Sequence, residues 1–96
     1  MKVLAISREI PPVDWSSLGD LLKEEARSLH ALYQEGHVRE FYFTSDGEAV
    51  LILESPSTDA ARSQLARLPL VRDGKITFEI TELLPYSGFE RLFPAG

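Results

Sequence analysis

Cysteine is absent from this chain of 96 residues, and its absence excludes disulfide scaffolds, thiol catalysis and cysteine-based zinc sites. Basic residues are also in short supply, because 10 lysines and arginines stand against 15 acidic residues and leave a formal net charge of −5. A nucleic-acid-binding protein needs a basic face to neutralise phosphates, so this balance argues against that class. The fold must therefore rest on apolar packing.

Long hydrophobic runs are missing too. The first one, Val3 to Ile6, is far shorter than the roughly 20 residues that span a bilayer, so we expect no signal peptide and no membrane partner. A cytoplasmic protein is the expectation. The chain also lacks a phosphate-binding glycine loop, a dinucleotide fingerprint and a serine elbow, and its two histidines, seven residues apart, do not make a metal motif. We expect no cofactor and no metal.

The residues that are present predict a single α+β domain over 1–96. Lys2 to Arg8 is typical of a strand, and Pro11 and Pro12 end it. Ser16 and Ser17 can cap a following helix, with Asp20 completing a capping box. An apolar stripe then recurs at three- and four-residue spacing as far as Gly36, which can close the helix.

Two more strands, 37–44 and 48–54, flank the turn signal Ser45-Asp46-Gly47 and predict a hairpin. A short helix is expected over 58–67, where Pro69 prevents its continuation. Residues 75–84 alternate apolar and polar side chains, which predicts an edge strand. The tail, about 85–96, is too apolar to float freely, so we expect it to dock on its own subunit or on a partner.

The resulting order of strand, helix, strand, strand, helix, strand is the ferredoxin-like βαββαβ arrangement, in which both helices cover one face of an antiparallel four-stranded sheet. The run Ala49 to Leu53 has no polar position, which indicates burial on both faces of the sheet. One subunit has too few residues to cover both faces. We therefore expect a second copy on the bare face, giving a homodimeric α+β barrel or a higher oligomer.

Three short segments stand out for their order and spacing. They are Glu24-Glu25, Glu35-Gly36-His37-Val38-Arg39 and Leu68-Pro69-Leu70. In this order and at this spacing they resemble the muconolactone isomerase-like family of dimeric α+β barrels. The resemblance covers roughly 18–84 and implies cofactor-free proton transfer on a small substrate such as a lactone. The sequence departs from the family after the last strand, where Leu84-Pro85-Tyr86 replaces a His-Pro pair.

Glu25 is the first candidate catalytic residue, because apolar neighbours on the helix would bury its carboxylate and raise its pKa, which suits a general base. A carboxylate at the stripe boundary can equally reach water or pair with an arginine. Arg39 can hold a substrate carboxylate with two hydrogen bonds, or bridge to Glu25 or another acid. His30 is a second catalytic candidate, although a packed or edge position is the commoner role for such a histidine.

Trp15, Tyr33 and Tyr42 are candidate substrate-binding residues, because each pairs an apolar ring with a polar tip; aromatic residues at these spacings are more often part of a core. The leading hypothesis is an isomerase-like protein that moves a proton on a small carboxylated organic molecule. Two alternatives stay open. One is a non-enzymatic ligand-binding or assembly module of the same fold, and the other is a cofactor-free monooxygenase.

Overall fold

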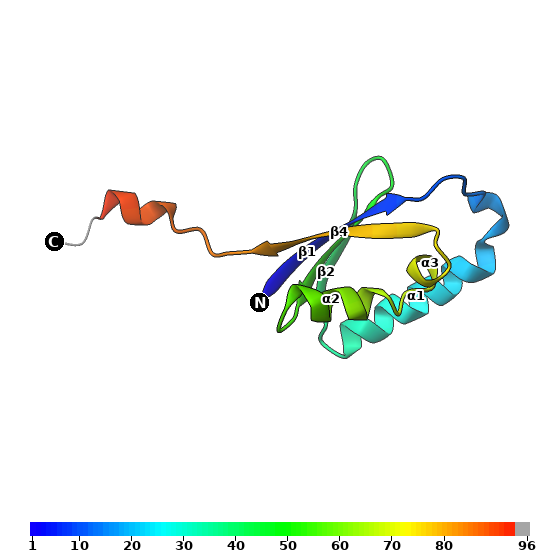
Figure 1. Cartoon of the computed structure of the whole chain (residues 1–96), viewed down its shortest axis with the longest axis horizontal. Coiled ribbons are helices and arrows are strands. Elements are labelled where there is room, and N and C mark those ends of the chain that lie inside the picture. Colours follow the sequence, from blue (N-terminus) through cyan, green and yellow to red (C-terminus); the bar gives the residue numbers. More distant parts are fainter. Residues whose placement is uncertain (94–96) are drawn as a thin grey trace.

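The computed structural model describes residues 1–93, and it places helices against one face of a single twisted sheet (Figure 1). The last three residues of the predicted tail, 94–96, lie outside the described residues. The elements run in the following order: β1 (Lys2–Glu9), the 3-10 turn η1 (Trp15–Ser17), α1 (Gly19–Gln34), β2 (Val38–Phe43), β3 (Ala49–Glu54), α2 (Thr58–Leu65), α3 (Pro69–Arg72), β4 (Ile76–Leu83) and the 3-10 turn η2 (Gly88–Leu92).

The four strands form one antiparallel sheet in the order β2-β3-β1-β4. β1 pairs with both β3 and β4, and a β-bulge interrupts the pairing of β2 with β3 between Val38 and Glu40. The ferredoxin-like α+β fold predicted from the sequence is confirmed, with β4 at an edge as expected. The strand boundaries differ from the predicted ones by one residue or so at each end.

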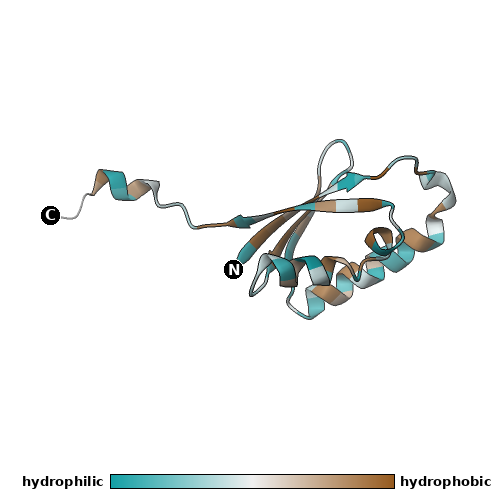
Figure 2. Cartoon of the chain, in the orientation of Figure 1, coloured by the Kyte–Doolittle hydropathy of each residue, from teal (hydrophilic) through white to brown (hydrophobic). Residues whose placement is uncertain are grey.

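Strand alternation explains which side chains meet the helices. Val3 and Ala5 of β1, Leu51 and Leu53 of β3, and Phe78 of β4 are buried on the helix side. They join buried residues of α1, α2 and α3 in one core, and Figure 2 shows hydrophobic residues recurring along α1 between hydrophilic ones. Burying this stripe is the main source of stability for such a helix.

The start of α1 differs from the prediction. Ser17 does not cap the helix, because its hydroxyl donates to the Asp14 carbonyl oxygen at 2.9 Å and lies in the separate turn η1. The cap position is Leu18, which offers no side-chain acceptor. The predicted capping box with Asp20 is therefore wrong: Asp14 organises its own turn first, through a hydrogen bond from the Ser16 backbone N–H.

The predicted end of α1 and the predicted start of α2 are confirmed. Gly36 ends α1 with φ +85°, a conformation that favours glycine. Ser57 caps α2, since its hydroxyl oxygen accepts the Ala60 N–H at 2.9 Å. The helix α2 ends at Leu65, two residues earlier than predicted, and Pro69 occupies the first turn of the short helix α3, where its missing N–H costs nothing.

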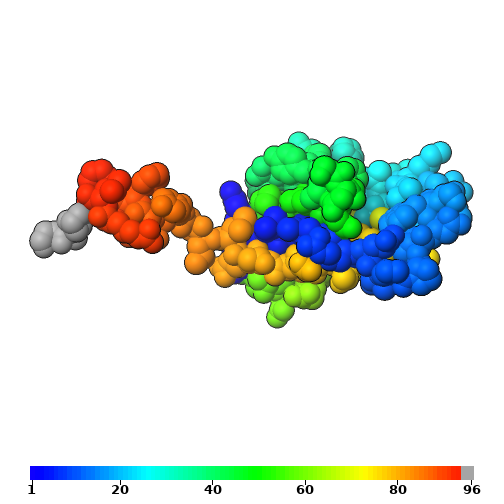
Figure 3. All heavy atoms as spheres, turned by 90° about the horizontal axis from the view of Figure 1, so that it is seen from above, coloured from blue at the N-terminus to red at the C-terminus, as the bar shows by residue number. Residues whose placement is uncertain are grey.

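The opposite face of the sheet carries no helix in residues 1–93. In Figure 3, which looks down from the side opposite the helices, the atoms of β1, β4 and the β2-β3 hairpin form the surface. Leu4, Ile6, Val50 and Ile52 lie half-buried on this face, because they alternate with the residues that face the helices. Residues 1–93 therefore leave the apolar centre of this face without a cover.

Beyond β4 the chain extends away from the domain, which gives the molecule a long axis of 62 Å (Figure 1). The apolar side chains of this segment are 67% to 78% exposed; they are Leu84, Tyr86, Phe89, Leu92 and Phe93. Over residues 85–93 the tail thus does not pack on its own domain. Docking on a partner, the other possibility raised by the sequence, stays a prediction. No helix within residues 1–93 combines the length and the apolarity that crossing a membrane requires.

Candidate functional site

A cavity of about 680 Å³ opens between the first half of α1 and the end of the sheet. The turns of α1 that line it contribute Leu22, Glu25, Ala26 and Leu29, and the sheet closes the other side. A volume of this size suits a small organic molecule. Leu22 remains 40% exposed although it belongs to the apolar stripe, because the space in front of it is not filled by the protein.

Glu25 is the carboxylate on the helix side of this cavity. It is half-buried, and its Oε1 accepts a hydrogen bond from the Leu70 backbone N–H at 2.9 Å. Burial raises the pKa of Glu25 above its ordinary value of 4.5, while the Leu70 hydrogen bond and the charge of Arg72 oppose that shift. A carboxylate fixed in position, with a raised pKa and access to a cavity, has the properties of a general base.

The contact between Glu25 and Leu70 also joins two of the segments that resembled the muconolactone isomerase-like family. Glu25 comes from the acidic pair on α1, and Leu70 comes from Leu-Pro-Leu, which forms the start of α3. Pro69 sets the first turn of α3, so that the N–H of the next residue has no partner inside the helix. That orphan N–H is the one that holds the carboxylate.

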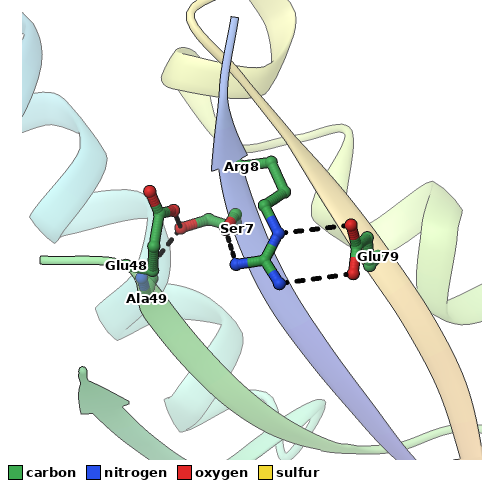
Figure 4. A network of polar contacts seen from close by, with 5 residues as sticks. All are labelled: Ser7, Arg8, Glu48, Ala49 and Glu79. Atoms are coloured by element: carbon green, nitrogen blue, oxygen red, sulfur yellow. Dashed lines mark hydrogen bonds and ion pairs between the residues drawn. The ribbon is translucent and has the colours of Figure 1, made fainter. Parts of the chain in front are cut away.

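A second polar group lies on the sheet side of the cavity (Figure 4). The Ser7 hydroxyl donates to Glu48 Oε2 at 2.7 Å and accepts the Ala49 N–H at 2.8 Å. The backbone pairing of β1 with β3 stops one residue earlier, at Ile6 and Val50, so the hydroxyl replaces a ladder hydrogen bond. Ser7 is buried and is thereby held rigidly beneath Glu48.

Trp15 and Glu9 also line the cavity, and the indole N–H of Trp15 donates a hydrogen bond to the Glu9 carboxylate. A smaller hollow of about 240 Å³ continues along β2 and shares Leu29, Phe43 and Ala49 with the main cavity. Together the two spaces form an apolar groove with its polar groups gathered at one end.

The structure brings together only some of the residues singled out from the sequence. Glu25 and Trp15 line the main cavity, and Tyr42 lines the smaller hollow. Tyr42 donates its hydroxyl to Glu40 at 2.8 Å, and this hydrogen bond to a carboxylate is the main reason why the pKa of Tyr42 is raised. Tyr33 packs edge-to-face on Phe41, with ring centroids 5.4 Å apart, and lines neither space.

His30 and Arg39 lie outside the cavity. His30 is an exposed residue of α1 beside Tyr33, at a ring distance of 6.3 Å. Arg39 follows the bend after α1, where its Nε donates to the Gly36 carbonyl oxygen at 2.9 Å. It does not pair with Glu25, so the bridge considered from the sequence is not formed.

Sequence reasoning missed three polar residues of the cavity, Ser7, Glu9 and Glu48. Ser7 carried a detectable signal, since it continues the inward-facing series Val3, Ala5 as a polar residue at an apolar position. Glu9 and Glu48 carried no such signal, because each stands at a strand end, where an ordinary solvated charge is common. Among residues 1–93, no group of three acidic or histidine side chains is arranged to hold a metal ion.

Solved structures of other proteins have a similar arrangement of helices and strands. Muconolactone isomerase superposes with a TM-score of 0.74 and 21% sequence identity, over 91% of this chain and 92% of the isomerase chain. The chain has the muconolactone isomerase fold. The resemblance drawn from the sequence is confirmed at this level.

A second solved structure shares the muconolactone isomerase fold with this chain. It is 5-chloro-2-hydroxyhydroquinone dehydrochlorinase from Burkholderia phenoliruptrix in complex with 2,5-dihydroxybenzoquinone, with a TM-score of 0.62 and 18% identity over 92% of this chain and 98% of that one. No protein-family model matches the chain, and no curated protein matches its sequence. Similarity at this identity describes the fold alone.

Proposed function

We propose that this chain is a cofactor-free enzyme that moves a proton on a small organic molecule, with Glu25 as the general base. The observation that supports the proposal most directly is a half-buried carboxylate of raised pKa, anchored by a backbone N–H, inside an apolar cavity. Positioning by Leu70 keeps the base in place, and the apolar walls strengthen its interaction with a proton on the substrate.

The two similar structures support the same class of chemistry. One is named for isomerising muconolactone, and the other for dehydrochlorinating 5-chloro-2-hydroxyhydroquinone. Isomerisation and loss of hydrogen chloride are both promoted by a base that removes a proton from a small molecule. The carboxylated substrate expected from the sequence depended on Arg39, whose guanidinium does not line the cavity, so we leave the carboxylate out of the proposal.

Exchange of substrate hydrogen with heavy water tests the role of Glu25. The probe is α-angelica lactone, a neutral enol-lactone, and the exchange is followed by NMR. Glu25→Gln should slow the catalysed exchange by about 10² to 10⁴, the usual effect of losing a general base. Glu24→Gln is the matched control, because its exposed side chain is adjacent in sequence but lies outside the cavity.

Exchange that continues undiminished in Glu25→Gln would remove this residue from the mechanism. If α-angelica lactone binds to the wild-type protein but does not exchange above the uncatalysed rate, the alternative of a non-enzymatic ligand-binding module is favoured.

We further propose that two copies of the chain pair through the bare sheet faces, with the tail of residues 85–96 docking on the partner. Leu4, Ile6, Val50 and Ile52 supply an apolar centre larger than the isolated apolar side chains common on monomer surfaces. The exposed aromatic residues of the tail supply a second apolar surface with no contact on its own domain.

Light scattering on the purified protein tests this pairing. The wild-type chain should be a dimer or larger at micromolar concentration. Ile52→Lys places a charge in the centre of the bare face and should yield monomers, whereas Ser63→Lys, at an exposed position on α2 on the other side of the sheet, is the control and should not. A wild-type chain that is monomeric at this concentration contradicts the pairing.

A further inference from the structure

The cavity has a one-sided charge composition. Its lining contains three carboxylates, Glu9, Glu25 and Glu48, and, among the residues that the structure describes, no lysine, arginine or histidine. The remainder of the lining is almost entirely apolar. A ligand that carries a negative charge would therefore enter a partly desolvated space beside like charges, and the repulsion would weaken its binding.

The nearest arginines on neighbouring elements are directed to other partners. Arg8 follows Ser7 on β1, but its side chain lies on the opposite face of the sheet and its Nε donates to Glu79 at 3.2 Å (Figure 4). Arg72 contacts Asp73 at 3.2 Å and Glu24 at 4.0 Å on the outside of α1 and α3. Neither side chain lines the cavity.

Glu48 lines the cavity and has one carboxylate oxygen without a hydrogen bond among the described residues. Its Oε2 accepts from Ser7, whereas its Oε1 has no hydrogen bond within residues 1–93. Ser7 is itself only 4% exposed and is fixed by the Ala49 N–H, so the carboxylate cannot turn away without leaving the Ser7 hydroxyl without its acceptor. A ligand with a hydroxyl or N–H group can satisfy this oxygen.

From these contacts we infer that the cavity selects uncharged ring compounds that donate a hydrogen bond to Glu48, such as hydroxylated lactones or phenols, and rejects their carboxylates. The inference concerns the substrate class of the site in the proposed function and rests on it. Glu48 is the specificity-determining residue, and Ser7 is the residue that positions it.

Binding of three matched probes tests the inference. Methyl protocatechuate is neutral and carries two phenolic hydroxyls, protocatechuate is its carboxylate, and methyl veratrate keeps the neutral ester but has both hydroxyls methylated. Isothermal titration calorimetry measures the affinities near neutral pH. The quenching of Trp15, the only tryptophan of the chain, reports whether a probe reaches the cavity.

The methyl ester should bind about tenfold or more tightly than protocatechuate, and methyl veratrate should bind less tightly than methyl protocatechuate. Glu48→Gln keeps an acceptor for Ser7 but removes the charge. It should therefore reduce the ratio of the affinities for methyl protocatechuate and protocatechuate several-fold. Glu82→Gln removes one negative charge outside the cavity and should leave this ratio of affinities unchanged. Equal or tighter binding of protocatechuate, or no binding of the ester, overturns the inference.

The Glu25→Gln variant separates this inference from the proposed function. If the ester is preferred but Glu25→Gln leaves hydrogen exchange intact, the selectivity stands and the assignment of the base fails. If Glu25→Gln abolishes exchange but protocatechuate binds as well as its ester, the base stands and the substrate class is wrong.

Discussion

The layer between α1 and the sheet has similar apolar residues at its two ends, but one end is filled by a packed core and the other contains the cavity. At the end of the sheet where β2 begins, Leu32, Val38 and Leu53 are fully buried, and α2 lies against the same end of the sheet (Figure 1). At the other end, Leu22 and Ala26 continue the same helical stripe but face the cavity, and only the four-residue helix α3 lies beside them. The difference teaches that the position of the covering helices, and not the stripe itself, decides where a space for a ligand opens.

The strongest way to sharpen this comparison is to shorten one leucine at each end. Leu32→Ala should lower the free energy of unfolding by about 2–5 kcal/mol, because it leaves a cavity in a filled core. Leu22→Ala should lower it by about 1 kcal/mol or less, since this side chain is already 40% exposed. Urea denaturation followed by circular dichroism measures both values. Equal losses would show that the open end is packed as tightly as the closed one.

A second comparison uses the two serines that the sequence offered as helix caps. Ser57→Ala removes the acceptor for the Ala60 N–H at the start of α2 and should cost about 1 kcal/mol of unfolding free energy. Ser17→Ala, at the open end, should change it by no more than about 0.5 kcal/mol, because Ser17 caps no helix. A cost for Ser17→Ala that matches that of Ser57→Ala would restore the capping box.

The smallest expected effect is a pH dependence of stability at the open end. Since the pKa of Glu25 is raised in the folded state, the folded protein binds this proton more tightly than the unfolded chain does. The stability that protonated Glu25 contributes is fully present at pH values below 4.5, the ordinary pKa of the side chain. It is lost as the pH rises through the folded-state pKa.

Glu25→Gln removes this titration, so its unfolding free energy relative to wild type should increase from acidic to neutral pH and then level off. Urea unfolding at a series of pH values measures the difference, with Glu24→Gln as the control for net charge. A relative stability of Glu25→Gln that grows on acidification would contradict the raised pKa.

Much of the fold could be predicted from the sequence, because the spacing of apolar residues and the residues at turns and helix ends both carried information. The stripe of α1, the glycine at its end and the Asp46-Gly47 turn each depend on neighbours within a few residues, and the structure has all three where they were expected. The start of α1 was mispredicted because Ser16 and Ser17 were both taken as possible helix caps. In the structure the backbone N–H and the hydroxyl of Ser16 donate to Asp14 Oδ1, and both serines lie in a separate local turn.

The candidate site was predictable only on the helix side. Glu25 could be found because apolar neighbours on its own helix indicated burial. Its anchor, the Leu70 N–H, lies 45 residues away along the chain, and Glu48 reaches Ser7 across 41 residues. Such pairings follow from strand register and from the angle at which α3 crosses, neither of which is encoded in a local pattern.

The hydrogen bond from Leu70 to Glu25 Oε1 has a stereochemical consequence. If Glu25 is the base that we propose, its carboxylate, with one oxygen tied to a backbone N–H at 2.9 Å, would approach a bound ring from a single direction. Of two mirror-related hydrogens on a methylene carbon, only the one turned toward α1 would then be within its reach. Turnover in heavy water would then leave deuterium with one handedness, and an optically active product would be the signature of that fixed geometry.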